Sequence, residues 1–227
     1  MLGTLVNFAA ILLGSFVGLF LRGGIPERFS NTIMQGIALC VFFIGIEGAL
    51  KVDNLLLVII CIAIGALIGE VIDIDKKFKQ LGDKLESKFK NSKSKISEGF
   101  VSASLLFCVG AMAILGSLES GLRGKHDILF SKSILDGVIS IMFSSTLGIG
   151  VAFSSFAVLL YQGTITIGSH FLSPFLTESV VNNMDAAGSL IIIGLGLNML
   201  GVTKIKVANL LPAIFLPILA QVIINIF

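Results

Sequence analysis

The sequence predicts an all-α integral membrane protein that crosses the bilayer about eight times. Hydrophobic residues make up 55% of the chain and charged residues only 13%, and the mean hydropathy is +1.01. Soluble domains carry charge on about a quarter of their residues. The apolar runs have close to the roughly 20 residues that a helix needs to span a bilayer. They are apolar on every face, whereas the strands of a membrane barrel would alternate in polarity.

Eight candidate spans follow one another along the chain, separated by charged or turn-forming residues. They are 3–21, 31–50, 54–72, 100–118, 133–150, 154–172, 185–201 and 207–226. Only a stretch of glycines and serines divides the fifth span from the sixth, so this pair is either two full spans or a re-entrant hairpin with a protein-covered backbone. Pro212 and Pro217 lie inside the eighth span, and we expect them to kink or interrupt it because proline removes backbone hydrogen bonds.

The segment from Asp73 to Glu98 is strongly charged, with eight lysines and five acidic residues. The positive-inside rule predicts that it lies in the cytoplasm. With eight spans, twelve of the sixteen basic residues then lie on the cytoplasmic side and both termini lie outside. Apolar residues recur at three- and four-residue steps from Ile74 to Phe89, which predicts an amphipathic helix on the membrane surface. Such a helix either tethers the protein to anionic lipid or binds a partner.

Two similar segments indicate an internal repeat. KVDNLL at 51–56 and KVANLL at 206–211 match at five of six positions, and each leads into an apolar helix. In the spans just before them, Glu47 corresponds to Asn198. The matching spans are five apart, so the two units face opposite ways across the membrane, as in the inverted repeats of transporters. The resulting division is a first three-helix repeat at 1–72, a Lys-rich linker at 73–98, central helices at 99–150 and a second three-helix repeat at 151–227.

Ionisable residues inside a span mark candidate functional sites, because they are costly to bury in lipid. Glu47 lies near the end of the second span and is either a ligand for a cation or proton, or an interfacial carboxylate paired with Lys51 four residues later. Asp136 lies near the start of the fifth span. It is either part of a polar site or a carboxylate that the helix dipole favours.

Uncharged polar residues complete the predicted site. Asn7, Gln162 and Asn198 lie in the first, sixth and seventh spans. Their carboxamide oxygens can replace part of the hydration shell of an ion. The alternative is that each joins neighbouring helices through hydrogen bonds. A shared site requires several of them to converge.

The sequence favours no enzyme, cofactor or nucleic-acid role. The three cysteines all lie in apolar runs without a CxxC pair or a histidine partner, so neither a disulfide framework nor a zinc site is indicated. A formal net charge of +2 is too small to indicate nucleic-acid binding. Gly14 with Gly18, and Gly65 with Gly69, have the GxxxG spacing of close helix packing, either within one chain or in a dimer.

Six stretches together resemble an uncharacterised bacterial membrane-protein family typified by YqgA. They are GTLVN at 3–7, IGALIGE at 64–70, SLLFCVGAMAILGSL at 104–118, LDGVISIMFSSTLGIGV at 135–151, LLYQG at 159–163, and GLGLNMLG with VANLLPA within 194–213. The resemblance covers nearly the whole chain. It implies a location in the bacterial inner membrane and assigns no substrate and no site residues.

These observations lead to two hypotheses about function. The first is a small secondary transporter or channel-like protein that forms a homodimer and moves an inorganic ion or small polar solute between inverted repeats. Its site is formed by Glu47, Asn198, Asn7, Asp136 and Gln162. The second is a membrane scaffold or regulatory subunit that does not transport and uses the Lys-rich helix as its contact. A hydrated cavity near the midplane is expected only for the first.

Overall fold

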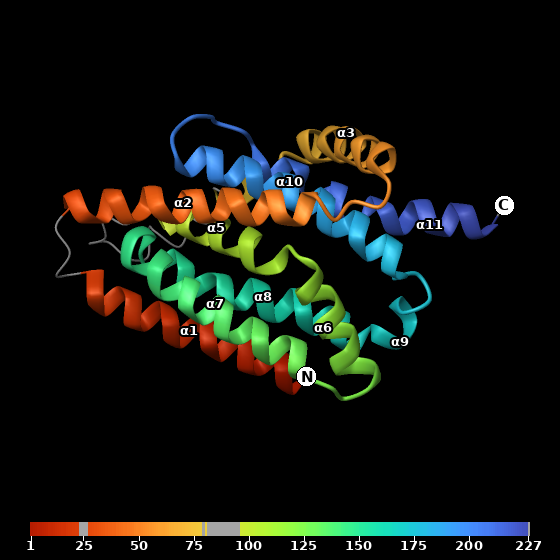
Figure 1. Ribbon diagram of the computed structural model, residues 1–227, viewed down its shortest axis with the longest axis horizontal. Coiled ribbons are helices and arrows are strands. Elements are labelled where there is room, and N and C mark those ends of the chain that lie inside the picture. Colours follow the sequence, from red (N-terminus) through yellow and green to blue (C-terminus); the bar gives the residue numbers. More distant parts are fainter. Residues whose placement is uncertain (23–26, 79, 81–95, 227) are drawn as a thin grey trace.

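A computed structural model describes residues 1–22, 27–78, 80 and 96–226, and all regular structure in these ranges is helical (Figure 1). The predicted all-α fold class is therefore confirmed. The helices are α1 (Leu2–Arg22), α2 (Glu27–Ala49), α3 (Leu55–Ile72), α5 (Ile96–Cys108), α6 (Ala111–Leu122), α7 (Asp127–Leu147), α8 (Gly150–Ile167), α9 (Ser169–Leu172), α10 (Glu178–Met199), the 3-10 helix η1 (Val207–Ile214) and α11 (Leu216–Ile226).

The described helices provide six or seven candidate membrane spans, where about eight were expected. α1, α3, α7, α8, α10 and the Asn31–Ala49 part of α2 are each long and apolar enough to cross a bilayer. α5 and α6 meet at an angle of 60°, and they provide a seventh candidate span if the pair is counted as one broken span. The eighth expected segment is η1 followed by α11, a shorter apolar stretch.

The interrupted eighth segment has the physical cause that the sequence indicated. Pro212 lies in η1, and the backbone N–H of Phe215 bonds to the Pro212 carbonyl in a tight 3-10 turn. The α-helix resumes at Leu216, with Pro217 in its first turn, where the missing N–H has no intrahelical partner to lose. The prolines therefore divide this segment into two short helices.

The outside of the bundle is apolar and much of its inside is polar. Phe20 is 90% exposed and Val71 is 87% exposed. The fully buried polar side chains are those of Thr4, Asn7, Ser15, Ser117, Ser140, Ser144, Ser154, Ser155 and Gln162. A water-soluble protein rarely exposes so many large apolar side chains, so this apolar exterior fits a lipid environment.

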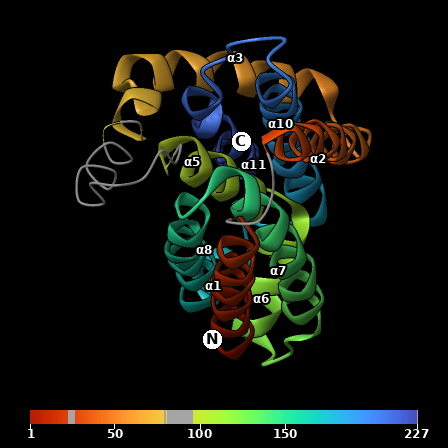
Figure 2. The ribbon, with the colours of Figure 1, turned by 90° about the vertical axis from the view of Figure 1, so that its left-hand side faces the viewer.

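Glycines bring α1 and α7 into backbone contact. A Cβ added at Gly14 would lie 2.3 Å from the carbonyl oxygen of Gly137, and one at Gly18 would lie 2.2 Å from that of Ile141. Both residue numbers rise together, so the two helices run in the same direction side by side (Figures 1 and 2). The first GxxxG pair thus packs inside one chain. An even number of reversals separates α1 from α7, which agrees with α5 and α6 together passing once through the bundle.

Two further helix pairs run antiparallel. Gly45 of α2 lies against Ile193 of α10, while Gly196 lies against Phe42, so the numbers run in opposite directions. α3 and η1 are paired in the same way: Gly69 lies against the backbone of Asn209, and Gly65, four residues earlier, lies against Ala213, four residues later. The second GxxxG pair is therefore also used inside the chain.

The predicted inverted repeat is not confirmed, although the helices it matches are neighbours. α2 packs on α10 and α3 packs on η1, as expected if the matching spans meet at a common axis. The two similar segments nevertheless differ locally. Asn54 caps the α-helix α3 by accepting from the Leu57 N–H, whereas its counterpart Asn209 lies within a 3-10 helix. The equivalence of the two units stays a prediction.

The fifth and sixth predicted spans are two full-length helices and not a short re-entrant pair. α7 has 21 residues and α8 has 18, and Gly148 at φ 84° makes the tight turn between them. α7 starts at Asp127, six residues before the predicted boundary at Ser133. This extra length proves decisive for the site.

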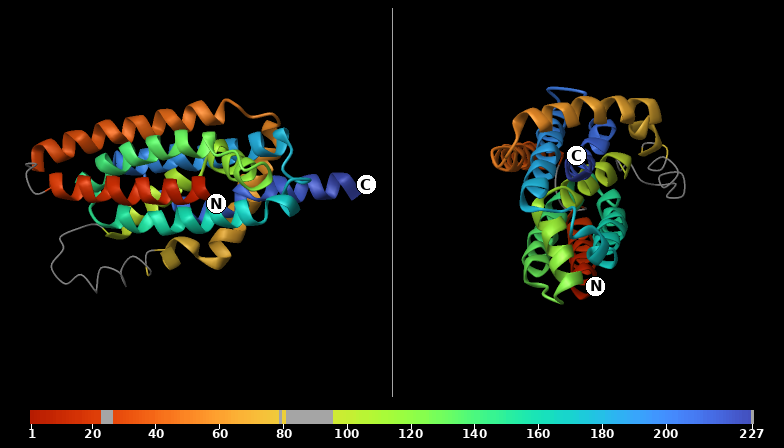
Figure 3. Two further views of the ribbon diagram at one scale, coloured as in Figure 1. Left: turned by 90° about the horizontal axis from the view of Figure 1, so that it is seen from below. Right: turned by 90° about the vertical axis from the view of Figure 1, so that its right-hand side faces the viewer.

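The predicted surface helix lies mostly outside the described residues, which omit 79 and 81–95. Its first residues, 74–78, are helical. They rest on the bundle, because the Asp75 N–H donates to Asn209 Oδ1 at 2.7 Å and the Phe78 ring lies 5.9 Å from that of Phe100. Viewed from below, α11 projects beyond the other helices (Figure 3).

Candidate functional site: a buried ion pair beside a polar cavity

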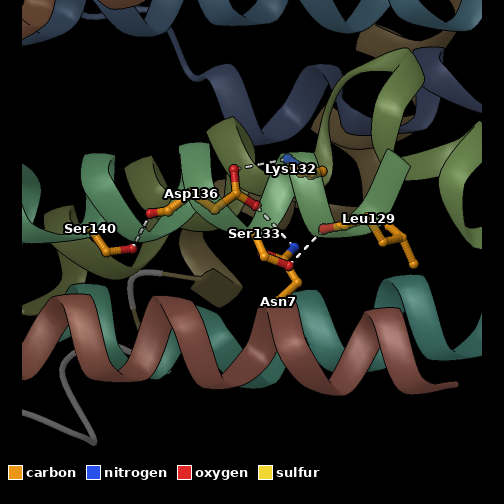
Figure 4. Close-up of polar contacts among 6 residues, drawn as sticks. All are labelled: Asn7, Leu129, Lys132, Ser133, Asp136 and Ser140. Atoms are coloured by element: carbon orange, nitrogen blue, oxygen red, sulfur yellow. Dashed lines mark hydrogen bonds and ion pairs between the residues drawn. The ribbon is translucent and has the colours of Figure 1, made fainter. Parts of the chain in front are cut away.

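Lys132 and Asp136 form a buried ion pair on α7. The Lys132 Nζ donates to Asp136 Oδ1 at 3.0 Å, and the two side chains are only 8% and 4% exposed. Asn7 of α1 donates from its Nδ2 to the other carboxylate oxygen at 3.0 Å (Figure 4). Two of the residues predicted for the site, Asn7 and Asp136, are thus bonded to each other across 129 positions of sequence.

The approach of α1 to α7 places Asn7 on the carboxylate. Asn7, Ile11, Gly14 and Gly18 follow one another at three- and four-residue steps, so they lie on a single face of α1. The glycines on this face let the two backbones touch, and Asn7 reaches Asp136 two turns nearer the start of the helix. Lys132 is four residues before Asp136 and therefore lies above it on the same side of α7.

The hydroxyl groups of the two serines near the pair donate hydrogen bonds within α7. Ser133 Oγ donates to the Leu129 carbonyl and Ser140 Oγ donates to the Asp136 carbonyl, both at 2.6 Å (Figure 4). Their hydroxyl protons are therefore used by the helix backbone. The charge of Asp136 is compensated by Lys132 and Asn7 alone among these residues.

A buried ion pair is an expensive element of structure. Taking two charges out of water costs several kcal/mol per ion, and pairing repays this cost only when the remaining hydrogen-bonding positions are filled. Here not every hydrogen-bonding position is occupied, because Asn7 Oδ1 has no hydrogen-bond partner within the described residues. Apolar side chains would pack this contact at least as stably, so the pair is a better candidate for function than for stability.

Lys132 and Asp136 lie in the wall of a cavity of about 430 Å³, here named the Asp136 cavity. α2, α5, α6, α7 and α10 contribute to this wall. Its polar lining residues are Glu47, Lys51, Lys132, Asp136, Asp185 and Ser189. The lining thus combines two cationic and three anionic side chains with a hydroxyl group, and it suits a charged or strongly polar solute.

Asp185 and Ser189 enter this cavity between two glycines. The Asp185 side chain is only 6% exposed. A Cβ at Gly110, where α5 gives way to α6, would lie 3.9 Å from Asp185 Oδ1, and a Cβ at Gly48 of α2 would lie 3.7 Å from Oδ2 and 2.0 Å from Ser189 Oγ. Because glycine has no side chain, Gly48 and Gly110 leave room for the side chains of Asp185 and Ser189.

Glu47 lies at the mouth of the Asp136 cavity and not in its interior. Its carboxylate pairs with Lys51 at 3.3 Å, and the two side chains are 61% and 58% exposed. This is the interfacial i, i+4 pair that the sequence allowed as an alternative.

Asn198 lies apart from the other predicted site residues, at the carboxyl end of α10, two residues beyond the contact of Gly196 with Phe42. Its Oδ1 accepts from the Ile205 N–H and from Thr203 Oγ1, and its Nδ2 donates to the Ile205 carbonyl. These bonds close the loop that follows α10. Because α10 is antiparallel to α2, the end of α10 cannot join Glu47, and no site contains both.

Asn198 lines a second cavity of about 570 Å³, here named the Asn198 cavity. Its polar lining residues are Asp75, Ser97, Glu98, Ser102, Asn198, Thr203, Lys204 and Lys206. The Lys206 ammonium donates to Glu70 of α3, and this hydrogen bond and the charge of Glu70 raise the pKa of Lys206 above its ordinary value. The pair fixes the loop against α3.

Gln162 is fully buried in α8 and its carboxamide has no hydrogen-bond partner within the described residues. One turn along the helix, Thr166 Oγ1 lies 3.4 Å from Thr4 Oγ1 of α1. α1 and α8 are antiparallel, since Phe8 packs on Phe156. Gln162 and Asn7 thus each lie about one turn from this threonine contact, on the facing sides of the two helices.

The sequence did not identify Lys132 or Asp185 as members of the site. Lys132 was placed in an outer loop because the fifth span was predicted to start at Ser133. Its i, i+4 spacing from Asp136 was the signal that could have found it. The predicted seventh span begins at Asp185, whereas α10 begins seven residues earlier, at Glu178, so that Asp185 lies within the helix.

Within the described part of the chain, no group of three or more His, Cys, Asp or Glu side chains is arranged to hold a metal ion. The buried ion pair and the charged side chains in the wall of the Asp136 cavity support a chemistry of charge and hydrogen bonding. The site can pair with an ion, exchange a proton at a carboxylate, or orient a small polar solute.

Comparison with known proteins places this architecture in a family. Residues 2–222 match the family described as protein of unknown function (DUF554). The chain is 32% identical to the uncharacterized membrane protein YdfK of Bacillus subtilis (strain 168), over 100% of this chain and 98% of the relative. It is 30% identical to the uncharacterized protein YqgA of Escherichia coli (strain K12), over 95% and 94%. No solved structure matches. The chain therefore belongs to the DUF554 family of membrane proteins, as its sequence motifs indicated.

Proposed function

We propose that this protein is a small transporter or channel-like protein that moves an inorganic ion or a small polar solute across the bacterial inner membrane. The observation that carries the proposal is the buried Lys132–Asp136 pair, held by Asn7 in the wall of a polar cavity. Charges inside membrane spans are rare, and they mark ion or substrate paths more often than structural contacts.

The arrangement of the cavities supports transport over simple anchoring. The Asp136 cavity contains Glu47 and Lys51 at the end of α2, and the Asn198 cavity contains the last residues of the antiparallel α10. The two cavities thus lie at different levels along α10, and each has charged side chains in its wall. A scaffold or regulatory subunit needs neither of them.

The expected orientation places the Lys-rich linker in the cytoplasm and both termini outside. The Asn198 cavity, which contains Asp75 and Glu98 from the two ends of that linker, then opens to the cytoplasm. Fusing a reporter that fluoresces only in the cytoplasm to the last residue tests this orientation, and fluorescence from that fusion would contradict it.

Homodimer formation stays part of the proposal as a prediction. Both GxxxG pairs are occupied inside the chain, so a second copy has to use another surface. Cross-linking in native membranes tests this prediction, and a purely monomeric pattern would refute it.

The test of function is charge movement in proteoliposomes after sodium, potassium or proton jumps. We expect a selective current in the wild type, at least a tenfold loss in Asp136→Asn and little change in Glu47→Gln, which changes an exposed carboxylate of the same cavity. Uptake of labelled glycine covers a small zwitterionic solute. Silence in every assay, with the protein folded and inserted, would favour the scaffold function.

A further inference from the structure

The two polar cavities line up along the same faces of the same helices. On α10, Asp185, Ser189 and Ile192 line the Asp136 cavity, and Leu195 and Met199 line the Asn198 cavity. Their spacings of four, three, three and four residues describe a single stripe of a helix. The two cavities are therefore consecutive parts of one seam along α10.

The broken pair α5 and α6 forms the other side of this seam. Glu98 and Ser102 line the Asn198 cavity, whereas Leu106 and Gly110 line the Asp136 cavity. Each is four residues from the next, so they too form one stripe. α5, α6 and α10 thus share both cavities.

Only about one helical turn of apolar side chains separates the cavities. At 1.5 Å per residue, Ile192 and Leu195 are about 4.5 Å apart along α10, and Ser102 and Leu106 are about 6 Å apart along α5. Leu106, Ile192 and Leu195 are each at least 94% buried. A narrow apolar constriction between two polar cavities blocks ions and polar solutes by excluding water.

The break between α5 and α6 lies directly beside this constriction. Gly110 has φ +125°, a conformation that side-chain-bearing residues rarely adopt, and the two helices meet there at 60°. A change at Gly110 moves α6 relative to α5 and so moves the cavity wall one turn from Leu106. Helix ends that absorb a dihedral change are the usual hinges of such motions.

We propose that the solute crosses the protein between α5–α6 and α10, through both cavities in turn, and that Leu106, Ile192 and Leu195 form its gate. This inference rests on the proposed function and adds the route to it. Closed, the gate holds the solute next to Lys132, Asp136 and Asp185. Opened, it connects that site to the cavity lined by Asn198.

Cysteine labelling tests the route without requiring knowledge of the solute. In a variant whose three native cysteines are replaced by alanine, Ser189→Cys and Ser102→Cys each place one thiol in one cavity. A membrane-impermeant methanethiosulfonate reagent is then added to right-side-out or inside-out vesicles. Ser155→Cys is the matched control, because this fully buried serine lines neither cavity.

We expect Ser189→Cys to react from one side only, Ser102→Cys from the other side only, and Ser155→Cys from neither. Adding Leu106→Ala should shorten the constriction and let Ser189→Cys react from both sides. The route is wrong if both cavity positions react from the same side, if neither reacts in folded protein, or if Leu106→Ala leaves the sidedness unchanged. Labelling is measured independently of flux. If labelling refutes the route but the Asp136-dependent current is present, the proposed transport function is retained and only the route is rejected.

Discussion

The buried pair predicts a specific pattern of stability in a double-mutant cycle at Lys132 and Asp136. Lys132→Met leaves a carboxylate that is 4% exposed with only the Asn7 amide as a partner. Asp136→Leu leaves a buried ammonium group instead. Removing one partner of a buried pair costs about 3 to 5 kcal/mol, because the other charge remains without compensation.

The double variant Lys132→Met/Asp136→Leu should be far more stable than either single variant. It removes both charges and replaces them with apolar side chains, an exchange that is often neutral. The remaining cost is the unpaired Asn7 amide, worth about 1 kcal/mol. The two substitutions should therefore be strongly non-additive, with a coupling of about 3 kcal/mol or more.

Thermal unfolding in detergent measures this cycle. Cys61 and Cys108 are not exposed and report unfolding through a thiol-reactive fluorogenic dye, provided that the exposed Cys40 is first replaced by alanine. For a chain of this size, about 3 to 5 kcal/mol corresponds to a fall in Tm on the order of 10 °C. The reasoning is refuted if either single variant melts within about 2 °C of the parent, or if the double variant melts at the sum of the two single shifts.

Three further substitutions test other parts of the structure. Gly14→Ala should lower the free energy of unfolding by about 1 to 3 kcal/mol, because the added Cβ meets the Gly137 carbonyl. Gly36 has open space around it, so Gly36→Ala should change the free energy of unfolding by less than about 1 kcal/mol. Equal melting curves for the two variants would contradict this packing. Asn198→Ala should cost about 2 kcal/mol through its three lost loop hydrogen bonds, and a melting curve equal to that of wild type would contradict its loop-closing role. Gln162→Leu should melt no lower than wild type, because the buried amide has no hydrogen-bond partner among the described residues. A fall in Tm on the order of 10 °C would show that the amide is bonded in the fold.

Six of the eight predicted spans could be identified from the sequence, because hydrophobic length is a direct physical requirement of the bilayer. The predicted spans 100–118 and 207–226 are instead each divided into two shorter helices. The sequence also identified the prolines that divide η1 from α11. It was less informative about boundaries, since a helix can continue past the last apolar residue when its polar residues face the protein interior. That is why Lys132 was assigned to a loop although it lies in the second turn of α7.

The candidate site was only partly predictable, because its residues converge through packing. Hydrophobicity shows that Asn7 and Asp136 are in spans, but their contact depends on the parallel approach of α1 and α7 at Gly14 and Gly18. Asn198 was grouped with them through a similarity between short segments. The antiparallel arrangement of α2 and α10 directs the end of α10 away from Glu47, and Asn198 closes the loop that follows α10.

The most direct test of the proposed function is the current through proteoliposomes that contain the Lys132→Met/Asp136→Leu double variant. This variant is expected to be folded and nearly as stable as wild type, so that loss of flux cannot be attributed to unfolding. We predict that the ion-jump current seen in wild type and in Glu47→Gln is reduced at least tenfold in the double variant. A current equal to that of wild type would contradict a role for the buried pair in moving the solute.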